Sequence, residues 1–366
     1  MSAEDDRRHM RHALGLGARG LGRTWPNPAV GCVILQGTRI VGRGWTQPGG
    51  RPHAETMALA QAGAAARGAT AYVTLEPCAH HGQTPPCAGA LSVAGVTRVV
   101  TALQDPDPRV AGQGHAMLRA AGVAVTEAVE ADAARMAHAG FLRRVTLGLP
   151  ALTLKLATTL DGRIATATGE SRWITGPAAR RHVHALRLAH DAVLVGAGTA
   201  RADDPDLTVR DMGAAHQPVR IVIDTHLALS PDSRLGHSAG ASAVWLCHGP
   251  DAPEAARTAW AATGARLITC TVSDGRIDPD PALRTLAGLG LTRILCEGGG
   301  LLAAALIRAG LVTDIVAFTA GTLIGQDGVP AVGRLHLDRL AGAPGFDLIG
   351  TSALGNDTLS CWTRRP

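Results

Sequence analysis

Short apolar runs of strand length alternate with alanine-rich stretches along the whole chain. In the first half the runs are Val30–Leu35, Ile40–Trp45, Ala71–Leu75 and Arg98–Leu103, and the helix-like stretch His53–Ala66 lies among them. The second half repeats the pattern, with runs at Ala192–Gly196, Val219–Asp224, Ala243–Cys247, Arg293–Cys296 and Ile315–Phe318. These runs are too continuous for sheets with one face in water. The pattern therefore predicts an α/β protein.

The length and one composition change indicate two domains. A chain of 366 residues suggests two domains at roughly 100–200 residues each. The stretch Glu127–Arg144 is helix-like, and the segment Thr146–Pro150 that follows it marks the predicted boundary. We therefore expect domains at 1–148 and 149–366. No period of about 20–50 residues repeats, which argues against a solenoid.

The composition is that of an ordinary globular protein, with 46% apolar and 18% charged residues, and it argues against disorder. No stretch approaches about 18 uninterrupted apolar residues, so no membrane span is expected. The charged start Met1–Met10 lacks the apolar core of a secretion signal. We expect a cytoplasmic enzyme.

The positive charge lies in the first half of the chain. Residues 1–148 hold 15 Arg and no Lys against 10 Asp and Glu, whereas residues 149–366 hold 20 basic and 20 acidic residues. No basic run exceeds a pair, and the chain has one Tyr, three Phe and six Trp. A nucleic-acid groove needs a basic stripe and stacking aromatic residues. A small anionic substrate fits better than nucleic acid or a membrane, and the sequence leaves open whether the chain forms homo-oligomers.

Seven cysteines, an odd number, argue against a disulfide framework. Cys78 and Cys87 stand out because they lie in a stretch rich in Pro, Gly and His, from Glu76 to Cys87 (EPCAHHGQTPPC). Four of the others lie in apolar runs and are expected in the core: Cys32, Cys247, Cys270 and Cys296.

His53, Cys78 and Cys87 together predict a catalytic zinc site. One imidazole and two thiolates suit tetrahedral zinc, and three protein ligands leave the fourth position for a water whose pKa falls to about 7. Glu55 lies two residues after His53 on the predicted helix, so it cannot share the metal on an ideal helix. In the first turn it can lie beside the water and shuttle protons. A non-ligand Glu between a His and a later Pro-Cys…Cys pattern is the signature of zinc deaminases.

Each part of this set also has a simpler interpretation. His53 alone fits a surface residue at a helix start, and the two cysteines alone fit stray thiols. A closed structural zinc site with His80 or His81 as the fourth ligand is a further alternative. The joint occurrence of H-A-E, P-C and a second cysteine favours catalysis.

Several longer motifs resemble the bifunctional deaminase–reductase family of riboflavin biosynthesis. They are Pro26–Gly31 (PNPAVG), residues 52–55 (PHAE), residues 72–87 (YVTLEPCAHHGQTPPC), Gln104–Pro108 (QDPDP) and Val110–Gly112 (VAG). The eight residues between Cys78 and Cys87 replace the two of most zinc deaminases. The resemblance covers nearly the whole chain.

The resemblance implies that a cytidine-deaminase-like three-layer domain comes first. This domain would remove the 2-amino group of 2,5-diamino-6-(5-phosphoribosylamino)pyrimidin-4(3H)-one by hydrolysis. Asn27 matches a family position that contacts the pyrimidine ring, although an Asn between prolines is also a turn former. Thr46 and Gln83 depart from the family, which often carries His and Lys or Arg there.

Motifs of the second half resemble the reductase of the same family. They are Leu154–Arg163 (LKLATTLDGR), Gly169–Ile174 (GESRWI), Val195–Pro205 (VGAGTARADDP) and Leu207–Arg210 (LTVR). That half resembles dihydrofolate reductase in fold. It would reduce the ribosyl side chain of the deaminated intermediate to ribityl with NADPH, and the absence of G-x-G-x-x-G is consistent with this fold.

A glycine-rich turn supports a nucleotide site. The strand Arg293–Cys296 runs into Glu297 and three glycines, and the helix-like stretch Leu301–Arg308 follows. Glycines permit close backbone approach, and a helix start offers free N–H groups to a pyrophosphate. Alone, such a turn is more often structural.

Family matching assigns the contacts of this domain residue by residue. NADPH contacts fall on Ala157, Trp173, Thr199, Asp203, Gly299, Gly300, Leu301, Leu302, Ala303, Ala304 and Ala305. Substrate contacts fall on Ser171, Arg187, Leu207, Arg210 and Glu297. The guanidinium groups of Arg187 and Arg210 suit a ribose phosphate, with surface ion pairing as the alternative.

Lys155 is the only lysine of the chain, which has 34 arginines. It is a candidate catalytic residue for substrate contact or proton transfer, and the alternative is that a single lysine is present by chance. Two other functions compete with the main hypothesis. One is a nucleic-acid-editing deaminase, and the other is a zinc-stabilised scaffold without catalysis.

Overall fold

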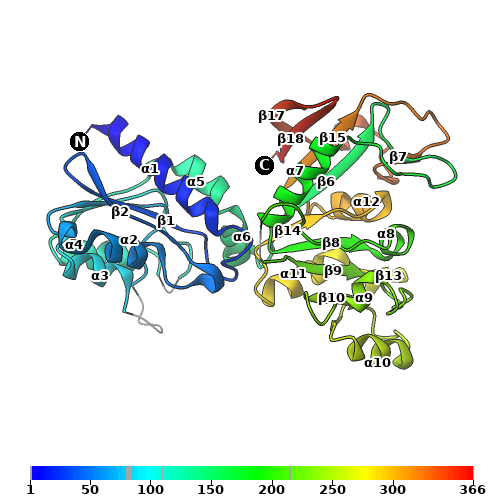
Figure 1. Cartoon of the computed structure of the whole chain (residues 1–366), viewed down its shortest axis with the longest axis horizontal. Helices are drawn as coiled ribbons and strands as arrows, with labels where there is room; N and C mark the ends of the chain where they lie inside the picture. The colour runs from blue at the N-terminus through cyan, green and yellow to red at the C-terminus, as the bar shows by residue number, and fades with distance from the viewer. Residues whose placement is uncertain (1, 80–84, 109, 214–215, 366) are drawn as a thin grey trace. The chain divides into compact units, whose positions relative to one another are not determined.

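The computed structural model describes residues 2–79, 85–108, 110–213 and 216–365. The chain divides into two compact units, Met1–Leu149 and Pro150–Pro366 (Figure 1). Each unit is built around a sheet of its own.

The first unit contains a five-stranded sheet in the order β2-β1-β3-β4-β5. Strands β1 and β2 pair antiparallel, β3 is antiparallel to β1, and β3, β4 and β5 are parallel. The bounds are Gly31–Gln36 (β1), Arg39–Trp45 (β2), Thr70–Val73 (β3), Arg98–Thr101 (β4) and Ala124–Thr126 (β5).

Helices cover both faces of this sheet (Figure 1). Side chains of α1 (Ala3–Gly17) and α5 (Ala131–Ala137) pack on one face around Val33 and Tyr72. On the other face, α2 (Ala54–Ala62), α3 (Cys87–Val93) and α4 (Gln113–Ala120) pack around Cys32, Ile34 and Val73. The unit is therefore a three-layer sandwich, as predicted.

Glycines in β2 allow α2 to approach the sheet closely. A Cβ atom on Gly44 would lie 2.1 Å from the Ala54 carbonyl oxygen, and one on Gly42 would lie 2.2 Å from that of Ala58. Both separations are far below van der Waals contact. Any larger residue would push away the helix that begins directly after His53.

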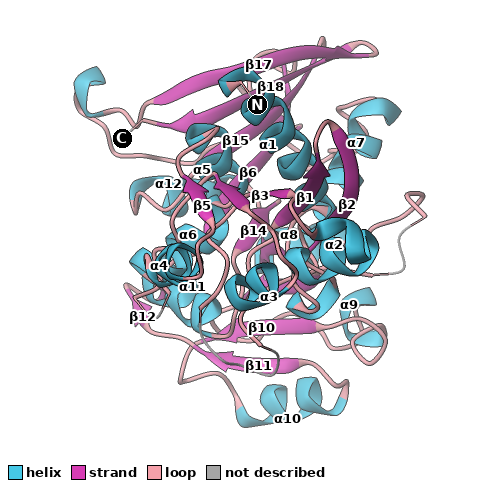
Figure 2. Ribbon diagram, turned by 90° about the vertical axis from the view of Figure 1, so that its left-hand side faces the viewer, coloured by secondary structure: helices cyan, strands magenta, loops and turns pink. Residues whose placement is uncertain are grey.

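The second unit contains a nine-stranded sheet in the order β11-β10-β9-β8-β14-β6-β15-β18-β17. All pairs from β11 to β15 are parallel, whereas β18 and β17 add an antiparallel hairpin at one edge. Figure 2 shows this hairpin at one end of the sheet and β10 and β11 at the other. The bounds are Ala151–Thr159 (β6), Ala192–Gly196 (β8), Val219–Ile223 (β9), Val244–His248 (β10), Arg266–Thr269 (β11), Arg293–Cys296 (β14), Asp314–Ala320 (β15), Phe346–Leu354 (β17) and Asp357–Arg364 (β18).

Helices pack on this sheet too, and two core clusters contain the fully buried side chains of Trp260, from α10, and Phe318, from β15. The helices are α7 (Pro177–Leu188), α8 (Ala197–Asp203), α9 (Arg234–His237), α10 (Glu254–Ala262), α11 (Pro279–Gly288) and α12 (Gly300–Arg308). Helix α6 (Ala139–Leu147) ends the first unit, and two-stranded ribbons pair β12 (Val272–Ser273) with β13 (Arg276–Ile277) and β7 (Arg163–Ala165) with β16 (Val329–Pro330). Short 3-10 helices span Ala18–Gly20, Pro48–Gly50, Gly63–Ala66 and Leu340–Gly342.

The predicted strands are confirmed, each overlapping an observed strand. The single helix predicted over Glu127–Arg144 is wrong, because α5 and α6 are separate helices that meet at His138, whose φ of −94° and ψ of 7° break the helical path. The hairpin β17–β18 has no counterpart in the sequence analysis. Most of β17 is exposed, so it lacks the apolar run that marks the other strands.

Candidate zinc and nucleotide sites

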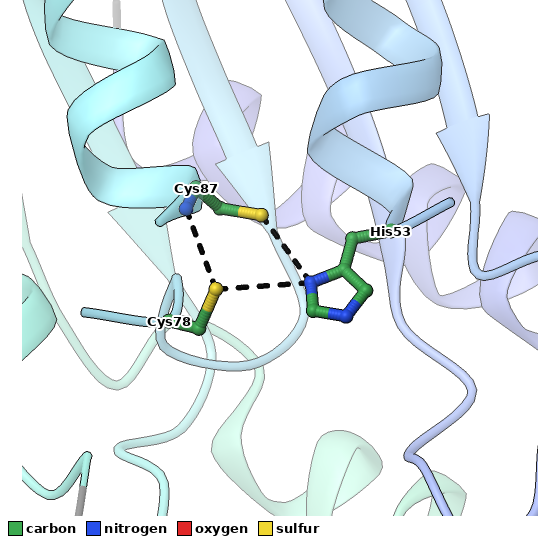
Figure 3. A group of neighbouring side chains, drawn as sticks. All are labelled: His53, Cys78 and Cys87. Carbon is green, nitrogen blue, oxygen red and sulfur yellow. Dashed lines mark hydrogen bonds between the residues drawn. The ribbon is translucent and has the colours of Figure 1, made fainter. Parts of the chain in front are cut away.

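His53, Cys78 and Cys87 converge although they come from three separate segments (Figure 3). His53 caps the start of α2, Cys78 lies in the loop after β3, and Cys87 begins α3 behind Pro86. His53 Nδ1 lies 3.7 Å from Cys78 Sγ and 3.4 Å from Cys87 Sγ. The predicted ligand set is therefore brought together within 4.8 Å.

These separations suit a tetrahedral zinc ion. With Zn–S near 2.3 Å and Zn–N near 2.0–2.1 Å, tetrahedral angles place the nitrogen about 3.6 Å from each sulfur. The two observed N···S distances bracket that value. In the described part of the chain, no fourth His, Cys, Asp or Glu joins the group; His80 and His81 lie outside the described residues.

Electrostatics prepares one sulfur to bind a metal. A hydrogen bond from the Cys87 thiol, with a further one from His53, lowers the pKa of Cys78 to about 4. The same thiol pair, together with burial, raises the pKa of Cys87. The Cys87 backbone N–H also donates to Cys78 Sγ over 3.3 Å. Cys78 is thus held as the thiolate that a metal requires.

Glu55 is buried beside the ligands, with 4% of its surface exposed. Burial and the nearby Cys78 sulfur raise the pKa of Glu55 to about 7, and its carboxylate is within hydrogen-bonding reach of Cys87. It lies in the first turn of α2, next to the ligand His53.

A buried carboxylate that the sequence analysis missed anchors the Cys78 loop. Glu76 accepts four backbone N–H bonds, from Asp105 (3.2 Å), Gly112 (3.0 Å), Gly114 (2.8 Å) and His115 (3.2 Å). A Cβ on Gly114 would lie 2.0 Å from the Pro77 carbonyl oxygen. These four backbone N–H groups therefore form a clamp on the residues just before Cys78. Two of them, those of Asp105 and Gly112, lie in the motifs QDPDP and VAG, but backbone donors leave no side-chain pattern that identifies Glu76.

Asn27 contacts the loop that leads to His53. Its Nδ2 donates to the Gly50 carbonyl over 3.3 Å, and a Cβ on Gly50 would overlap that amide at 1.9 Å. Thr46 is 2% exposed, and its hydroxyl accepts the Val30 N–H over 3.0 Å. Where the family often has His, this chain therefore uses a backbone-bonded Thr. Gln83 lies outside the described residues.

In the second unit, the predicted cofactor residues other than Trp173 lie near the carboxyl ends of three neighbouring parallel strands, β8, β14 and β6. Thr199 Oγ1 in α8 accepts the Gly299 N–H over 2.9 Å, which joins α8 to the glycine turn after β14. A Cβ on Gly300 would lie 2.7 Å from the Pro330 carbonyl oxygen. The edge formed by the carboxyl ends of parallel strands is where open α/β sheets bind nucleotides.

Arg187 and Glu297 form a buried ion pair beside this turn. Arg187 Nε and Nη2 donate to the two carboxylate oxygens over 2.6 and 2.9 Å, and Nη1 donates to the Thr208 carbonyl over 2.8 Å. Lys155 on β6 is close enough to interact electrostatically with both members of the pair, and Asp203 on α8 interacts in turn with Lys155. Burial lowers the pKa of Lys155, against the opposing effect of Glu297.

Residues 204–211 form a loop, here called the arginine loop, that follows α8 and includes Leu207 and Arg210. Leu207 is 3% exposed with φ +55°, and Arg210 is exposed, its Nη1 bonding Asp206 Oδ2 over 3.0 Å. The guanidinium of Arg210 therefore remains accessible to solvent, whereas that of Arg187 is engaged with Glu297.

Trp173 is 70% exposed, so its location is not that of a core Trp. The guanidinium of Arg180 lies 4.6 Å above its ring. Arg172 Nη2 donates to the Asp203 carbonyl over 2.7 Å, which joins the Ser171–Trp173 segment to the end of α8.

Comparisons with known proteins define the class of both units. Residues 3–103 match the family model of the cytidine and deoxycytidylate deaminase zinc-binding region, and residues 150–360 match that of the RibD C-terminal domain. Together with the His/Cys/Cys group, these matches define a zinc deaminase joined to a reductase of dihydrofolate reductase-like fold. In the described part of the chain, no helix has the length and apolar character to cross a bilayer.

Several known proteins are similar to this chain over nearly its full length. The riboflavin biosynthesis protein RibD of Escherichia coli (strain K12) is 42% identical over 364 residues, covering 96% of this chain and 97% of that protein. The structure of Acinetobacter baumannii RibD (form 1) superposes with a TM-score of 0.89 at 36% identity and covers all of both chains. The deaminase/reductase of Thermotoga maritima matches with a TM-score of 0.86 at 31% identity, covering 99% of each chain.

The chain belongs to the RibD family of bifunctional deaminase–reductases of riboflavin biosynthesis. The resemblance inferred from the motifs is thereby confirmed, as are the fold class of both units and the cofactors zinc and NADPH.

Proposed function

We propose that this chain converts 2,5-diamino-6-(5-phosphoribosylamino)pyrimidin-4(3H)-one to its ribityl product in two steps, one in each unit. The observation that carries the assignment of the first step is the convergence of His53, Cys78 and Cys87 beside the buried carboxylate of Glu55. The printed name of the Thermotoga maritima relative describes a diaminohydroxyphosphoribosylaminopyrimidine deaminase and 5-amino-6-(5-phosphoribosylamino)uracil reductase.

In the deaminase unit, His53, Cys78 and Cys87 would hold the zinc ion, which when bound supplies hydroxide at neutral pH. Glu55 takes the proton from the attacking water and delivers it to the departing amino group. Asn27, tied to Gly50, contacts the pyrimidine ring. The product is 5-amino-6-(5-phosphoribosylamino)uracil, whose ribosyl side chain the second unit reduces.

In the reductase unit, the start of α12 and the glycine turn bind the cofactor pyrophosphate, with Thr199 fixing the turn. NADPH supplies the hydride. Arg210 binds the ribose phosphate, while Arg187, Glu297 and Lys155 orient the opening sugar. The remaining proposed contacts are Ser171 and Leu207 for the substrate, and Ala157, Trp173, Asp203, Gly299, Gly300, Leu301, Leu302, Ala303, Ala304 and Ala305 for NADPH.

The partner is a small phosphoribosyl pyrimidine, not a nucleic acid, because the chain has no basic run longer than a pair. We also place the enzyme in the cytoplasm. All seven cysteines are free, and the zinc site needs two of them reduced, as a reducing compartment ensures.

Product analysis by mass tests the proposal. With zinc but no NADPH, the purified protein should convert the diamino substrate only to the deaminated intermediate, 1 mass unit heavier (NH exchanged for O, ~+1 Da). Adding NADPH should yield the ribityl product, 2 mass units heavier again (~+2 Da). Reduction of the diamino substrate before deamination would contradict the proposed order.

A further inference from the structure

His184 contacts the backbone of Arg210, although the sequence analysis did not single it out. It lies on α7, three residues before Arg187 and therefore on the same face of the helix. The Arg210 backbone N–H donates to His184 Nδ1 over 3.2 Å. The imidazole is half-buried, so this acceptor lies between the helix and the arginine loop.

The arginine loop needs support from outside because its backbone is strained. Asp204, Leu207 and Asp211 all have positive φ, at 41°, 55° and 57°, which side chains other than glycine disfavour.

Side chains from neighbouring elements hold the loop residue by residue. Arg220 Nη1 donates to the Asp206 carbonyl over 3.2 Å, and Arg187 Nη1 donates to that of Thr208. Gln217 bonds both the N–H and the carbonyl of Val209, over 2.6 and 3.1 Å. At Arg210 itself, the corresponding contact comes from His184.

We propose that His184 is a positioning residue of the reductase site: its neutral imidazole accepts the Arg210 N–H and so fixes the guanidinium where it meets the substrate phosphate. This inference rests on the proposed role of Arg210. A nitrogen that accepts a hydrogen bond carries no proton, so the ring proton lies on Nε2. Protonation of Nδ1 would place its N–H opposite the N–H of Arg210. The hydrogen bond would then be lost and the loop released.

The surroundings of His184 keep its imidazole neutral. Burial and the positive charges of Arg187 and Arg210 lower its pKa, against the opposing effects of Glu297 and the Thr208 carbonyl. The contact is therefore present above this lowered pKa and is lost as the pH falls through it. We expect the KM for the phosphorylated substrate to rise in that acidic range.

Two amide variants distinguish the roles of the two ring nitrogens of His184. His184→Asn places an acceptor oxygen near the position of Nδ1, whereas His184→Gln places it near that of Nε2. At pH 8, His184→Gln should raise the KM for 5-amino-6-(5-phosphoribosylamino)uracil about five-fold, the loss of one hydrogen bond of about 1 kcal/mol. His184→Asn should restore it to within about two-fold, with little change in kcat. His182→Gln is the matched control, because His182 lies on the same helix but its ring packs against Phe318 of β15.

The pH profile provides the second readout. As the pH falls from 8 to the acid limit at which both proteins remain folded, the KM of the wild-type enzyme should rise relative to that of His184→Asn, because only histidine titrates. Equal KM values for the Asn and Gln variants, or a constant ratio over this range, would overturn the role of His184. The parallel variant Arg210→Ala separates the two proposals. If Arg210→Ala leaves the KM unchanged, the phosphate assignment fails. If Arg210→Ala raises the KM but the His184 variants do not, only the role proposed for His184 is rejected.

Discussion

Arg187 and Glu297 form a two-pronged ion pair, Nε to Oε1 at 2.6 Å and Nη2 to Oε2 at 2.9 Å. The pair joins α7 to the residue that follows β14, directly before the glycine turn. Its side chains are only 12% and 9% exposed. Burying a charge costs free energy, and here the attraction between the two opposite charges offsets that cost. Removing one charge leaves the other buried without compensation.

Glu297→Gln should therefore destabilise the reductase unit. Removing one partner of a buried pair costs about 3–5 kcal/mol, and the remaining exposure places this pair near the lower value. We expect a lower melting temperature for the transition of the second unit and an unchanged transition for the deaminase unit, measured by calorimetry. A variant as stable as the wild type would show that water or another group compensates Arg187.

The same pair predicts a pH dependence of stability. Burial raises the pKa of Glu297, but the charges of Arg187 and Lys155 outweigh it and the net pKa is lowered. A carboxyl group whose pKa is lower in the folded than in the unfolded state stabilises the fold. This stabilisation is complete above the pKa in the unfolded state, about 4.3, and is lost as the pH falls through the pKa in the folded state. The difference in melting temperature between wild type and Glu297→Gln should thus shrink below about pH 4. A constant difference would argue against the ion pair as its source.

Glu76→Ala should weaken zinc binding as well as stability. It leaves four largely buried N–H groups without an acceptor, at a cost of about 1–3 kcal/mol for each group that water cannot reach, and frees the loop before Cys78. Competition with a fluorescent chelator should show a zinc affinity lower by about 10-fold or more.

Asp191→Ala is the matched control for Glu76→Ala. Asp191 also accepts buried backbone bonds, from Thr292 at 2.6 Å and Arg293 at 2.8 Å, but it lies in the reductase unit. It should destabilise that unit and leave the zinc affinity unchanged. If both variants weaken zinc binding equally, the effect is general instability and not the clamp.

Arg210→Ala tests the proposed phosphate contact. A hydrogen bond from a charged group to a phosphate contributes more binding free energy than one from a neutral group. The KM for the phosphorylated substrate should therefore rise ten-fold or more, which corresponds to about 1.4 kcal/mol. The KM for NADPH should stay within about two-fold. An equal rise in both values would place Arg210 in the cofactor site or in the scaffold.

The three zinc ligands and Glu55 could be predicted from the sequence because these residue types and their spacing are chemically distinctive. Cys78 and Cys87 stood apart from the core cysteines, and His53 opened an obvious helix. Glu76 was not recognised, since its four partners are backbone N–H groups that leave no side-chain pattern.

The reductase unit was less predictable for the same physical reason. Its glycine turn and strand were visible, but the pairing of Arg187 with Glu297 joins residues 110 positions apart. The positive φ of Leu207 has no marker in the sequence, because glycine is the usual residue there. The contact between His184 and the Arg210 backbone is likewise a product of folding.

The central claim, two separate active sites in one chain, is tested most directly with Glu55→Gln. This variant removes the proton shuttle and keeps His53, Cys78 and Cys87. The measurement is zinc content together with both half-reactions, the reductase being supplied with the deaminated intermediate. We predict one zinc per chain, deamination slowed by at least about 100-fold, and reduction at the wild-type rate. A folded, zinc-loaded variant that still deaminates at the wild-type rate, or one that has lost reduction as well, would contradict it.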